Sequence, residues 1–203
     1  RGRRVTVLDH TNKAGKKILM SGGGRCNFTN LNVKPECYRS HNPHFCRSAL
    51  SRYTPKDFIA LVEQHNIAYH EKTLGQLFCN NKSKDIVNML LHECQQAGVT
   101  LKLNTTITAL KKNSDHHFRI ETTQGVFTAH SVIVATGGLS IPTLGASAFG
   151  YQLASQFEIP VHPTRAGLVP FTLHPHDKAK FSPLSGISLA CSVTCNNQAF
   201  SEN

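Results

Sequence analysis

The chain has 203 residues, of which 39% are hydrophobic and 17% are charged. This length suits one large domain or two small ones, and the composition excludes an intrinsically disordered chain. The net charge is +10, and residues 1–50 hold ten of the 22 basic residues but two of the twelve acids. Such a basic N-terminal quarter favours a polyanionic ligand, either a phosphate-bearing cofactor or a nucleic acid, although a solvated basic face would have the same composition.

Several protein classes are excluded by what the sequence lacks. There is no run of eighteen apolar residues and no secretory signal peptide, so we expect a cytoplasmic protein without a membrane partner. The number of cysteines, seven, is odd, which argues against a secreted disulfide framework. The sequence has no Cys-x-x-Cys motif, so we predict no metal site. Because the first residue is Arg1 and residues 1–4 resemble the end of a helix, we interpret the chain as a fragment whose natural start lies upstream.

The first half of the chain predicts a short buried strand, a glycine-rich loop and three helices. The strand covers residues 5–9 and ends at Asp9, and the loop covers residues 21–30. Pro43 is predicted to open a helix that ends near Tyr53, and Thr54 is predicted to cap the next, which ends near His65. Further elements are a hairpin of residues 67–70 and 76–79 around Gly75, and a helix capped by Ser83, with Ile86, Met89, Leu90 and Cys94 inward and Gly98 as its stop.

The second half predicts mainly strands. Four short strands are expected at residues 99–103, 105–110, 118–122 and 126–129, followed by a buried strand at 131–138 that ends in a glycine turn. A helix at 150–157 precedes a linker that contains Pro160, Pro163 and Pro170, and strand character returns beyond Pro183. There, Ile187, Leu189, Cys191, Val193 and Cys195 alternate along one strand face and are predicted to be core residues.

Three of these segments have the residue types of a nucleotide site. A strand that ends in an acid, here Asp9, is typical of the second strand of a dinucleotide-binding unit, where the carboxylate accepts hydrogen bonds from ribose hydroxyls. Three consecutive glycines from Gly22 allow close approach of a ligand, and Arg25 beside them can pair with a phosphate, although a flexible turn is the alternative. The third segment is Ala-Thr-Gly-Gly at 135–138, which follows the predicted strand.

In this order and spacing, the segments resemble the BaiN/RdsA-type flavoproteins, also described as NAD(FAD)-utilising dehydrogenases or aminoacetone-oxidase-like proteins. The resemblance covers essentially all 203 residues. Its matching segments are residues 5–9, 15–30, 69–78, 132–142, 150–154 and 163–172. The run Ser-Gly-Gly-Gly-Arg-Cys-Asn at 21–27 is the most specific of its motifs.

The resemblance implies a fold and a cofactor. The fold would be α/β: a Rossmann-like two-dinucleotide-binding FAD domain at residues 1–165, truncated at its N-terminus and lacking its first strand and glycine fingerprint, and the start of an inserted β-rich domain at 166–203. The cofactor would be FAD, and tight binding by this fragment alone is not implied. The residues that the resemblance places at FAD are Asp9, Lys16, Lys17, Gly22, Gly23, Gly24, Arg25, Cys26, Asn27, Ile107, Ala135, Thr136, Gly137 and Gly138.

The implied activity is that of an FAD-dependent oxidoreductase. Residues 69–79 are similar to the branch of the family that forms dihydrouridine in large-subunit ribosomal RNA, so the resemblance implies reduction of uridine, with NADH or NADPH as electron donor by association. Reduction of the uracil C5–C6 bond needs a hydride and a proton, and Cys26, then Cys79, are the candidate acids, with a packed hydrophobic role as the alternative for each. Two other functions stay open: a flavin oxidase or reductase for a small molecule such as an amine, and a non-catalytic RNA-binding flavoprotein.

Overall fold

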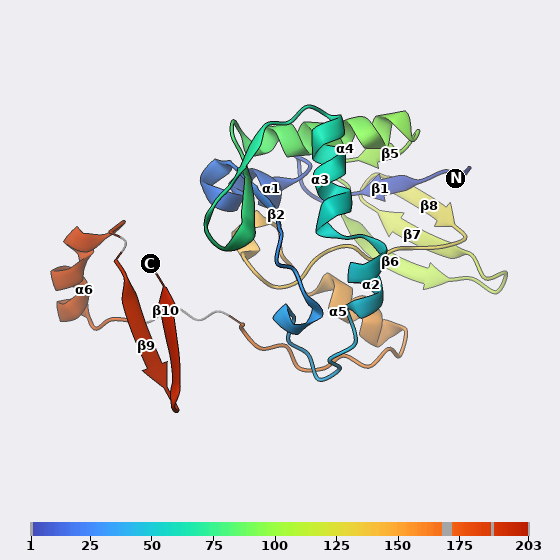
Figure 1. Cartoon of the computed structure of the whole chain (residues 1–203). Helices are drawn as coiled ribbons and strands as arrows, with labels where there is room; N and C mark the ends of the chain where they lie inside the picture. Colours follow the sequence, from blue (N-terminus) through green and yellow to red (C-terminus); the bar gives the residue numbers. More distant parts are fainter. Residues whose placement is uncertain (1, 168–171, 188, 203) are drawn as a thin grey trace. The chain divides into compact units, whose positions relative to one another are not determined.

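The chain forms two compact units, Arg1–Val161 and His162–Asn203, in the computed structural model (Figure 1). The model describes residues 2–167, 172–187 and 189–202. Within these residues, no helix combines the length and the apolar character that a membrane span requires. Pro170, predicted to be part of the linker, lies outside the described residues.

A pair of parallel strands joins the N-terminal segment to the middle of the first unit. Strand β1 (Thr6–Leu8) pairs with β5 (Thr100–Lys102), with Thr6 opposite Thr100. Parallel neighbours need a long crossover connection, and here the intervening residues hold four helices and a small sheet. The first unit is therefore a mixed α/β structure, as the sequence predicts.

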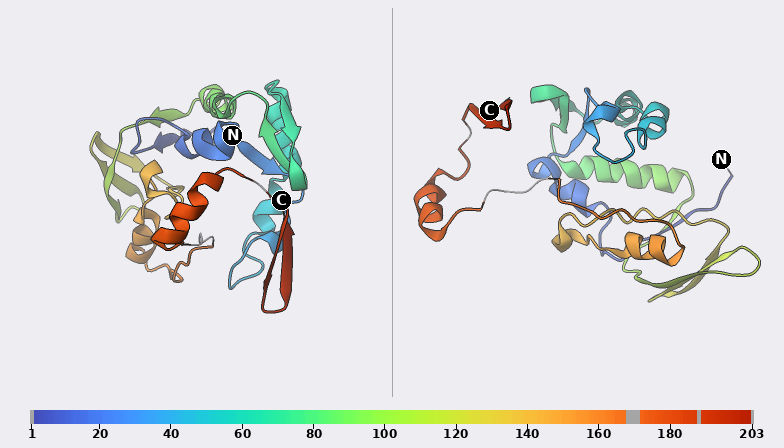
Figure 2. Two further views of the ribbon diagram at one scale, coloured as in Figure 1. Left: turned by 90° about the vertical axis from the view of Figure 1, so that its left-hand side faces the viewer. Right: turned by 90° about the horizontal axis from the view of Figure 1, so that it is seen from below.

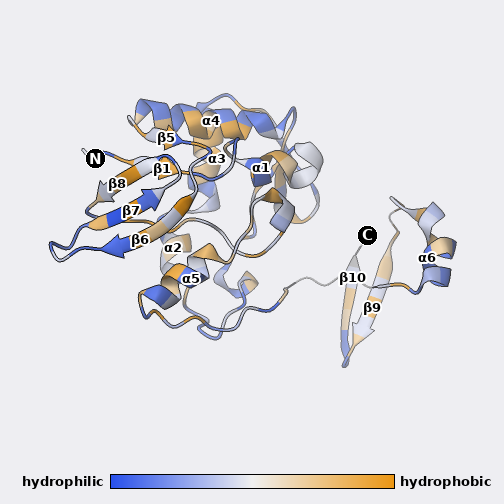
Figure 3. Cartoon of the chain, turned by 180° about the vertical axis from the view of Figure 1, so that it is seen from behind, coloured by the Kyte–Doolittle hydropathy of each residue, from blue (hydrophilic) through white to orange (hydrophobic). Residues whose placement is uncertain are grey.

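Helix α1 (Lys16–Met20) packs against α4 (Ser83–Gln96) in this crossover. The hydroxyl of Ser83 donates a hydrogen bond to the carbonyl oxygen of Leu19 at 3.0 Å. The hydrophobic side of α4 is turned toward α1 and α3 (Figure 3). We predicted Ser83 as the N-cap of this helix, which is wrong: Lys82 is the N-cap residue, and the Ser83 hydroxyl is buried in its bond to α1.

The two helices before the hairpin differ in how well the sequence predicts them. Helix α3 (Pro55–Gln64) begins as expected, with a capping box in which the Thr54 hydroxyl accepts a hydrogen bond from the Asp57 amide and the Asp57 carboxylate accepts one from the Thr54 amide. Helix α2 (Arg47–Arg52) is shorter than predicted. It does not begin at Pro43, because residues 43–46 form turns.

Three antiparallel strands form a small sheet beside α3, in the order β2-β4-β3. The predicted hairpin consists of β3 (Tyr69–Glu71) and β4 (Gln76–Cys79). Strand β2 (Asn27–Asn30), which follows the glycine loop, pairs with β4 and was not predicted as a strand. Between this sheet and the helices lies the first core cluster, whose buried members are Cys26, Val62, Cys79, Ile86 and Met89.

A second core cluster lies between a three-stranded meander and α5 (Phe149–Gln156), which covers one face of the meander (Figure 2). The meander consists of β6 (Ile107–Lys112), β7 (Phe118–Thr122) and β8 (Gly125–Ala129). Leu110 and Ile120 pack there against Leu153 of α5. The four predicted strands thus exist, but the first of them, β5, pairs with β1 and is no part of the meander.

The predicted buried strand at 131–138 is not formed. These residues carry no strand assignment, and the side chain of Ile133 is 90% exposed. In the described part of the chain no strand pairs with them, so their backbone groups have no ladder to join. For the same reason, β1 is paired on one edge, and Val5 and Val7 are exposed where we predicted burial.

The second unit consists of a short helix and a hairpin. Helix α6 (Pro175–Phe181) was not predicted. Strands β9 (Cys191–Cys195) and β10 (Gln198–Glu202) are joined by Asn196 and Asn197, which both have positive φ, as a two-residue hairpin turn requires. The predicted core role of this strand is wrong for the described residues: Ile187, Leu189, Cys191, Val193 and Cys195 are all exposed.

Candidate functional site

The three glycines after α1 form a left-handed turn. Gly22, Gly23 and Gly24 have φ values of +56°, +63° and +85°, a region that other residues rarely adopt. At Gly22 a side chain is also excluded by space, since a Cβ atom would lie 2.6 Å from Cε1 of Phe78. At Gly23 and Gly24 a Cβ atom would meet nothing within 4 Å. The backbone at these two residues is therefore open to a ligand from outside.

The residues after the glycines turn inward. Arg25 is exposed, whereas Cys26 is 4% exposed and has a φ of +56°. The amide of Cys26 donates to the carbonyl oxygen of Ser21, and the amide of Cys79 donates to the carbonyl oxygen of Arg25. These bonds place Cys26, just before β2, and Cys79, at the end of β4, in one buried cluster.

The two cysteines differ in their surroundings. Burial, followed by the charges of Cys26 and Asp85, raises the pKa of the Cys79 thiol to about 11. Cys79 is fully buried, whereas Cys26 lines a pocket of about 310 Å³ between the glycine loop and the helices. The other residues of this pocket are Lys17, Ile18, Ser21, Asn27, Phe28, Phe58, Ile86 and Leu90. Of the two candidate acids, Cys26 is the one that a ligand in the pocket would meet.

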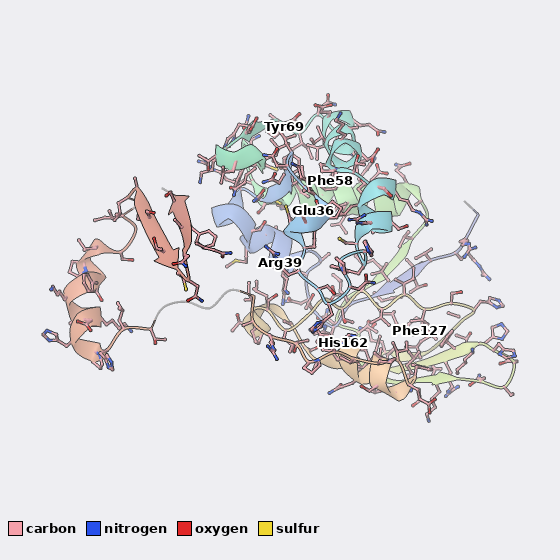
Figure 4. All side chains as sticks on the ribbon, turned by 60° about the horizontal axis from the view of Figure 1, so that its bottom comes forward. Glu36, Arg39, Phe58, Tyr69, Phe127 and His162 are labelled. Atoms are coloured by element: carbon pink, nitrogen blue, oxygen red, sulfur yellow. The ribbon has the colours of Figure 1, made fainter. Side chains whose placement is uncertain are left out.

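Aromatic rings form one wall of this pocket. The rings of Phe28 and Phe58 lie 6.0 Å apart between centroids, and Phe28 also packs edge-on against Tyr69 at 5.5 Å. Figure 4 marks Phe58 and Tyr69 among the side chains of this part of the unit. A pocket with an apolar aromatic wall, and with Lys17 and Asn27 as polar groups, suits a planar ring with polar edges.

Asp9 lies at the carboxyl end of β1, as predicted. Its Oδ1 atom accepts a hydrogen bond from the Thr11 amide at 2.8 Å, and its side chain remains 35% exposed. The carbonyl oxygen of Asp9 accepts a hydrogen bond from the Thr105 amide, which brings the start of β6, at Ile107, toward this strand end. Ligands of α/β proteins bind at the carboxyl ends of parallel strands, and Asp9 occupies such a position.

A hydrogen bond connects helix α1 to the segment that follows the second pair of glycines, Gly137 and Gly138. Lys17 donates from Nζ to the hydroxyl of Ser140 at 3.3 Å, across 123 residues of sequence. Lys16 has no such bond among the described contacts. Residues 135–138 lie against α5, because a Cβ atom on Gly150 would stand 2.8 Å from Oγ1 of Thr136. The structure thus brings Lys17, just before the glycine loop, into contact with Ser140, just after residues 135–138.

Sequence reasoning missed Ser140, Phe28 and Phe58 as members of this region. No pattern in the sequence marks Ser140, whose contact depends on a lysine far away in the chain. The place of Phe58 in the pocket wall depends on Phe28 of the unpredicted strand β2. In the described ranges of the chain, no group of three or more His, Cys, Asp or Glu residues is arranged to hold a metal ion.

Comparison with known proteins gives a family match over most of the chain. Residues 1–184 match the model of the HI0933-like protein Rossmann domain. The chain is 50% identical over 203 residues, all of its length, to "Ribosomal RNA dihydrouridine synthase" of Escherichia coli, and covers 50% of that protein. It is 50% identical over 196 residues to the protein of the same name of Haemophilus influenzae, with 95% of this chain and 49% of the relative covered.

A more distant relative has a small-molecule name. The chain is 27% identical over 178 residues to "3-dehydro-bile acid delta(4,6)-reductase" of Clostridium scindens, with 87% of this chain and 43% of the relative covered. The chain therefore spans about half the length, or less, of the curated relatives that it matches.

Proposed function

The chain belongs to the HI0933-like Rossmann family, and on this premise we propose that its protein is an FAD-dependent oxidoreductase that reduces uridine to dihydrouridine in ribosomal RNA. The observation that carries this proposal is the 50% identity, over every residue of the chain, to a protein named for that reaction. The excess of basic residues in the first quarter of the chain agrees with an RNA substrate.

The residues of the candidate site fit FAD. The carboxylate of Asp9 is accessible at the end of β1 and would accept hydrogen bonds from the ribose hydroxyls. The open left-handed backbone at Gly23 and Gly24 leaves room for the cofactor to approach. Lys17 and Arg25 would supply positive charge for its pyrophosphate. The family resemblance implies further contacts with the cofactor from Lys16, Asn27, Ile107 and residues 135–138.

The chemistry that bound FAD supplies is hydride transfer to the C5–C6 double bond of the uracil ring. The second ring carbon needs a proton. We assign the role of proton donor to the Cys26 thiol, which lines the pocket beside the glycine loop. The sulfur–hydrogen bond breaks as the carbon–hydrogen bond forms, and the thiolate recovers its proton from water. Cys79 is the second candidate, but it is fully buried and does not line the pocket.

We infer NADH or NADPH as the electron donor, by association with related oxidoreductases. Anaerobic addition of either to the purified full-length protein would bleach the flavin absorbance if it donates electrons. If neither nucleotide bleached the flavin, nicotinamide donors would be excluded and the rest of the proposal would remain intact.

The decisive experiment is deletion of the complete gene, followed by mass spectrometry of ribosomal RNA. We expect the loss of one dihydrouridine, restored by the intact gene. Unchanged RNA would overturn the proposal. It would favour a flavin-dependent reductase of a small molecule, a function for which the named reductase of Clostridium scindens is the supporting observation.

A further inference from the structure

Exposed aromatic side chains gather on the segment between β2 and α3. Tyr38, Phe45 and Tyr53 are 43%, 52% and 55% exposed. The rings of Tyr38 and Phe45 lie edge to face, with 6.5 Å between centroids and 74° between planes. Large aromatic rings are usually buried, so an exposed group of three marks a surface that binds something.

A row of rings leads from this segment to the pocket that contains Cys26. Tyr53 packs edge-on against Phe58 at 6.5 Å, and Phe58 packs against Phe28 at 6.0 Å. Phe28 and Phe58 are both part of the pocket wall. Tyr53 therefore connects the end of this segment to the candidate site.

Positive charge accompanies the aromatic rings. Between residues 34 and 53 the chain has four basic side chains, Lys34, Arg39, Arg47 and Arg52, and a single acid, Glu36. Glu36 and Arg39 are marked on this segment in Figure 4. All four basic residues are exposed, and none of them belongs to a salt bridge of the described part of the chain. Their charge is available to a ligand.

The segment is held in place although most of it is exposed. Cys46, which precedes α2, is 7% exposed, and its thiol donates to the carbonyl oxygen of Pro35 at 3.9 Å. The side chain of Asn42 accepts a hydrogen bond from the His44 amide at 2.9 Å. The first contact ties Cys46 to the start of the segment and the second fixes a local turn, so part of the conformational entropy of the segment is already lost before a ligand binds.

We propose that residues 34–53 form a docking surface for single-stranded RNA, which would deliver a uridine to the pocket. Unpaired bases stack on exposed aromatic rings, and phosphates pair with arginines at intervals along the strand. This inference rests on the proposed function, since it names the surface that holds the substrate. A protein partner is disfavoured, because a net charge of +3 over 20 residues, together with three exposed aromatic rings, suits a polyanion with stacking groups.

The test measures binding of a fluorescently labelled, uridine-rich single-stranded RNA to the full-length protein. Tyr38→Ala and Phe45→Ala are each expected to weaken binding roughly tenfold, the effect of losing one stacked base. Tyr38→Phe keeps the ring and is expected to bind like the wild type. Arg39→Ala and Arg47→Ala are each expected to lower the slope of affinity against salt concentration by about one.

Two matched controls are residues outside the segment 34–53. Phe181→Ala removes an aromatic ring that is 45% exposed and whose centroid lies 5.6 Å from Nζ of Lys180. Lys84→Ala removes an exposed positive charge from α4. Both should leave RNA affinity within about twofold of the wild type, as expected for surface changes outside the interface.

The outcomes separate this inference from the proposed function. The docking surface would be overturned if both aromatic variants bound RNA as tightly as the wild type. It would also be overturned if a duplex of the same length bound as tightly as the single strand. Either result would leave a protein as the occupant of this surface. The gene deletion tests the function independently. Loss of dihydrouridine with normal binding by the variants would reject the surface alone, and weakened binding with unchanged ribosomal RNA would reject the function alone.

Discussion

A Cβ atom on Gly22 would lie 2.6 Å from the ring of Phe78 and 2.9 Å from the amide nitrogen of Asn27. The glycine loop is thus pressed against β4 at its first glycine, whereas its second and third glycines face open space. The three glycines therefore serve different purposes. Gly22 allows the loop to pack on the sheet, and Gly23 and Gly24 leave an accessible left-handed backbone.

This difference predicts that Gly22→Ala and Gly23→Ala destabilise the protein unequally. Both substitutions incur the left-handed backbone cost of about 1–2 kcal/mol. Gly22→Ala adds a steric clash that costs roughly 1–3 kcal/mol more. Urea unfolding of the two variants measures the difference, and equal free energies of unfolding would contradict the packing of Gly22 on Phe78.

The capping box of α3 predicts a pH-dependent contribution to stability. Hydrogen bonds from the hydroxyl and the amide of Thr54 hold the pKa of the Asp57 carboxyl below its ordinary value. Because the folded pKa is lower than the unfolded one, this contribution is present above the unfolded pKa near 3.8 and is lost as the pH falls through the folded pKa. Asp57→Asn should therefore lower the unfolding temperature at neutral pH, and the difference from the wild type should shrink in acid.

Two variants of Thr54 provide the control for this prediction. Thr54→Ala removes the hydroxyl and should cost about 1 kcal/mol, the usual effect of losing an N-cap. Thr54→Ser keeps the hydroxyl and should retain the pH dependence. A pH profile of Asp57→Asn that runs parallel to that of the wild type would show that the carboxylate has no part in the cap.

This cap also shows which parts of the fold can be predicted from sequence. Thr54, Pro55 and Asp57 are neighbours in the chain, so the start of α3 is encoded locally and is predicted correctly. Strand β2 is not, because its pairing depends on residues about 50 positions away. Residues 131–138 have the composition of a buried strand, but composition cannot supply the neighbouring strand that burial requires.

The same distinction holds for the candidate site. The glycine run and Asp9 at a strand end are local patterns, and the sequence identifies both. The contact of Lys17 with Ser140, which is 123 residues away in the chain, is visible only in three dimensions. Likewise, the proximity of Cys26 and Cys79 follows from the register of β2 and β4. The sequence does not predict this register, because it does not predict β2 as a strand.

The burial of the cysteines predicts their order of alkylation. Cys37, Cys191 and Cys195 are exposed and should react first with iodoacetamide at mildly alkaline pH. Cys79 should be protected, both by burial and because its pKa of about 11 leaves little thiolate at that pH. Peptide mass spectrometry after timed labelling measures each rate. In denaturant all seven cysteines should react, and native labelling of Cys79 as fast as Cys37 would contradict the structure.

The first core cluster predicts a large difference between two valines. Val62 of α3 is fully buried, and Val62→Ala should cost about 2 kcal/mol through lost burial and the cavity left behind. Val126 of β8 is 50% exposed, and Val126→Ala should cost roughly 0.5 kcal/mol or less. Denaturant unfolding of both variants tests this, and a cost at Val126 equal to that at Val62 would count against the core described here.

The proposed role of Cys26 predicts a loss of activity without a loss of cofactor. Removing a positioned general acid typically slows a reaction by about 10²–10⁴-fold. Cys26→Ala in the full-length protein should slow dihydrouridine formation on ribosomal RNA to this extent, with the flavin absorbance of the purified protein unchanged. Cys94→Ala is the control, because Cys94 is a half-buried cysteine of α4 that neither lines the pocket nor belongs to residues 34–53, and it should retain the wild-type rate. A Cys26→Ala variant with a normal rate would transfer the acid role to Cys79, and Cys79→Ala would then be the variant that loses activity.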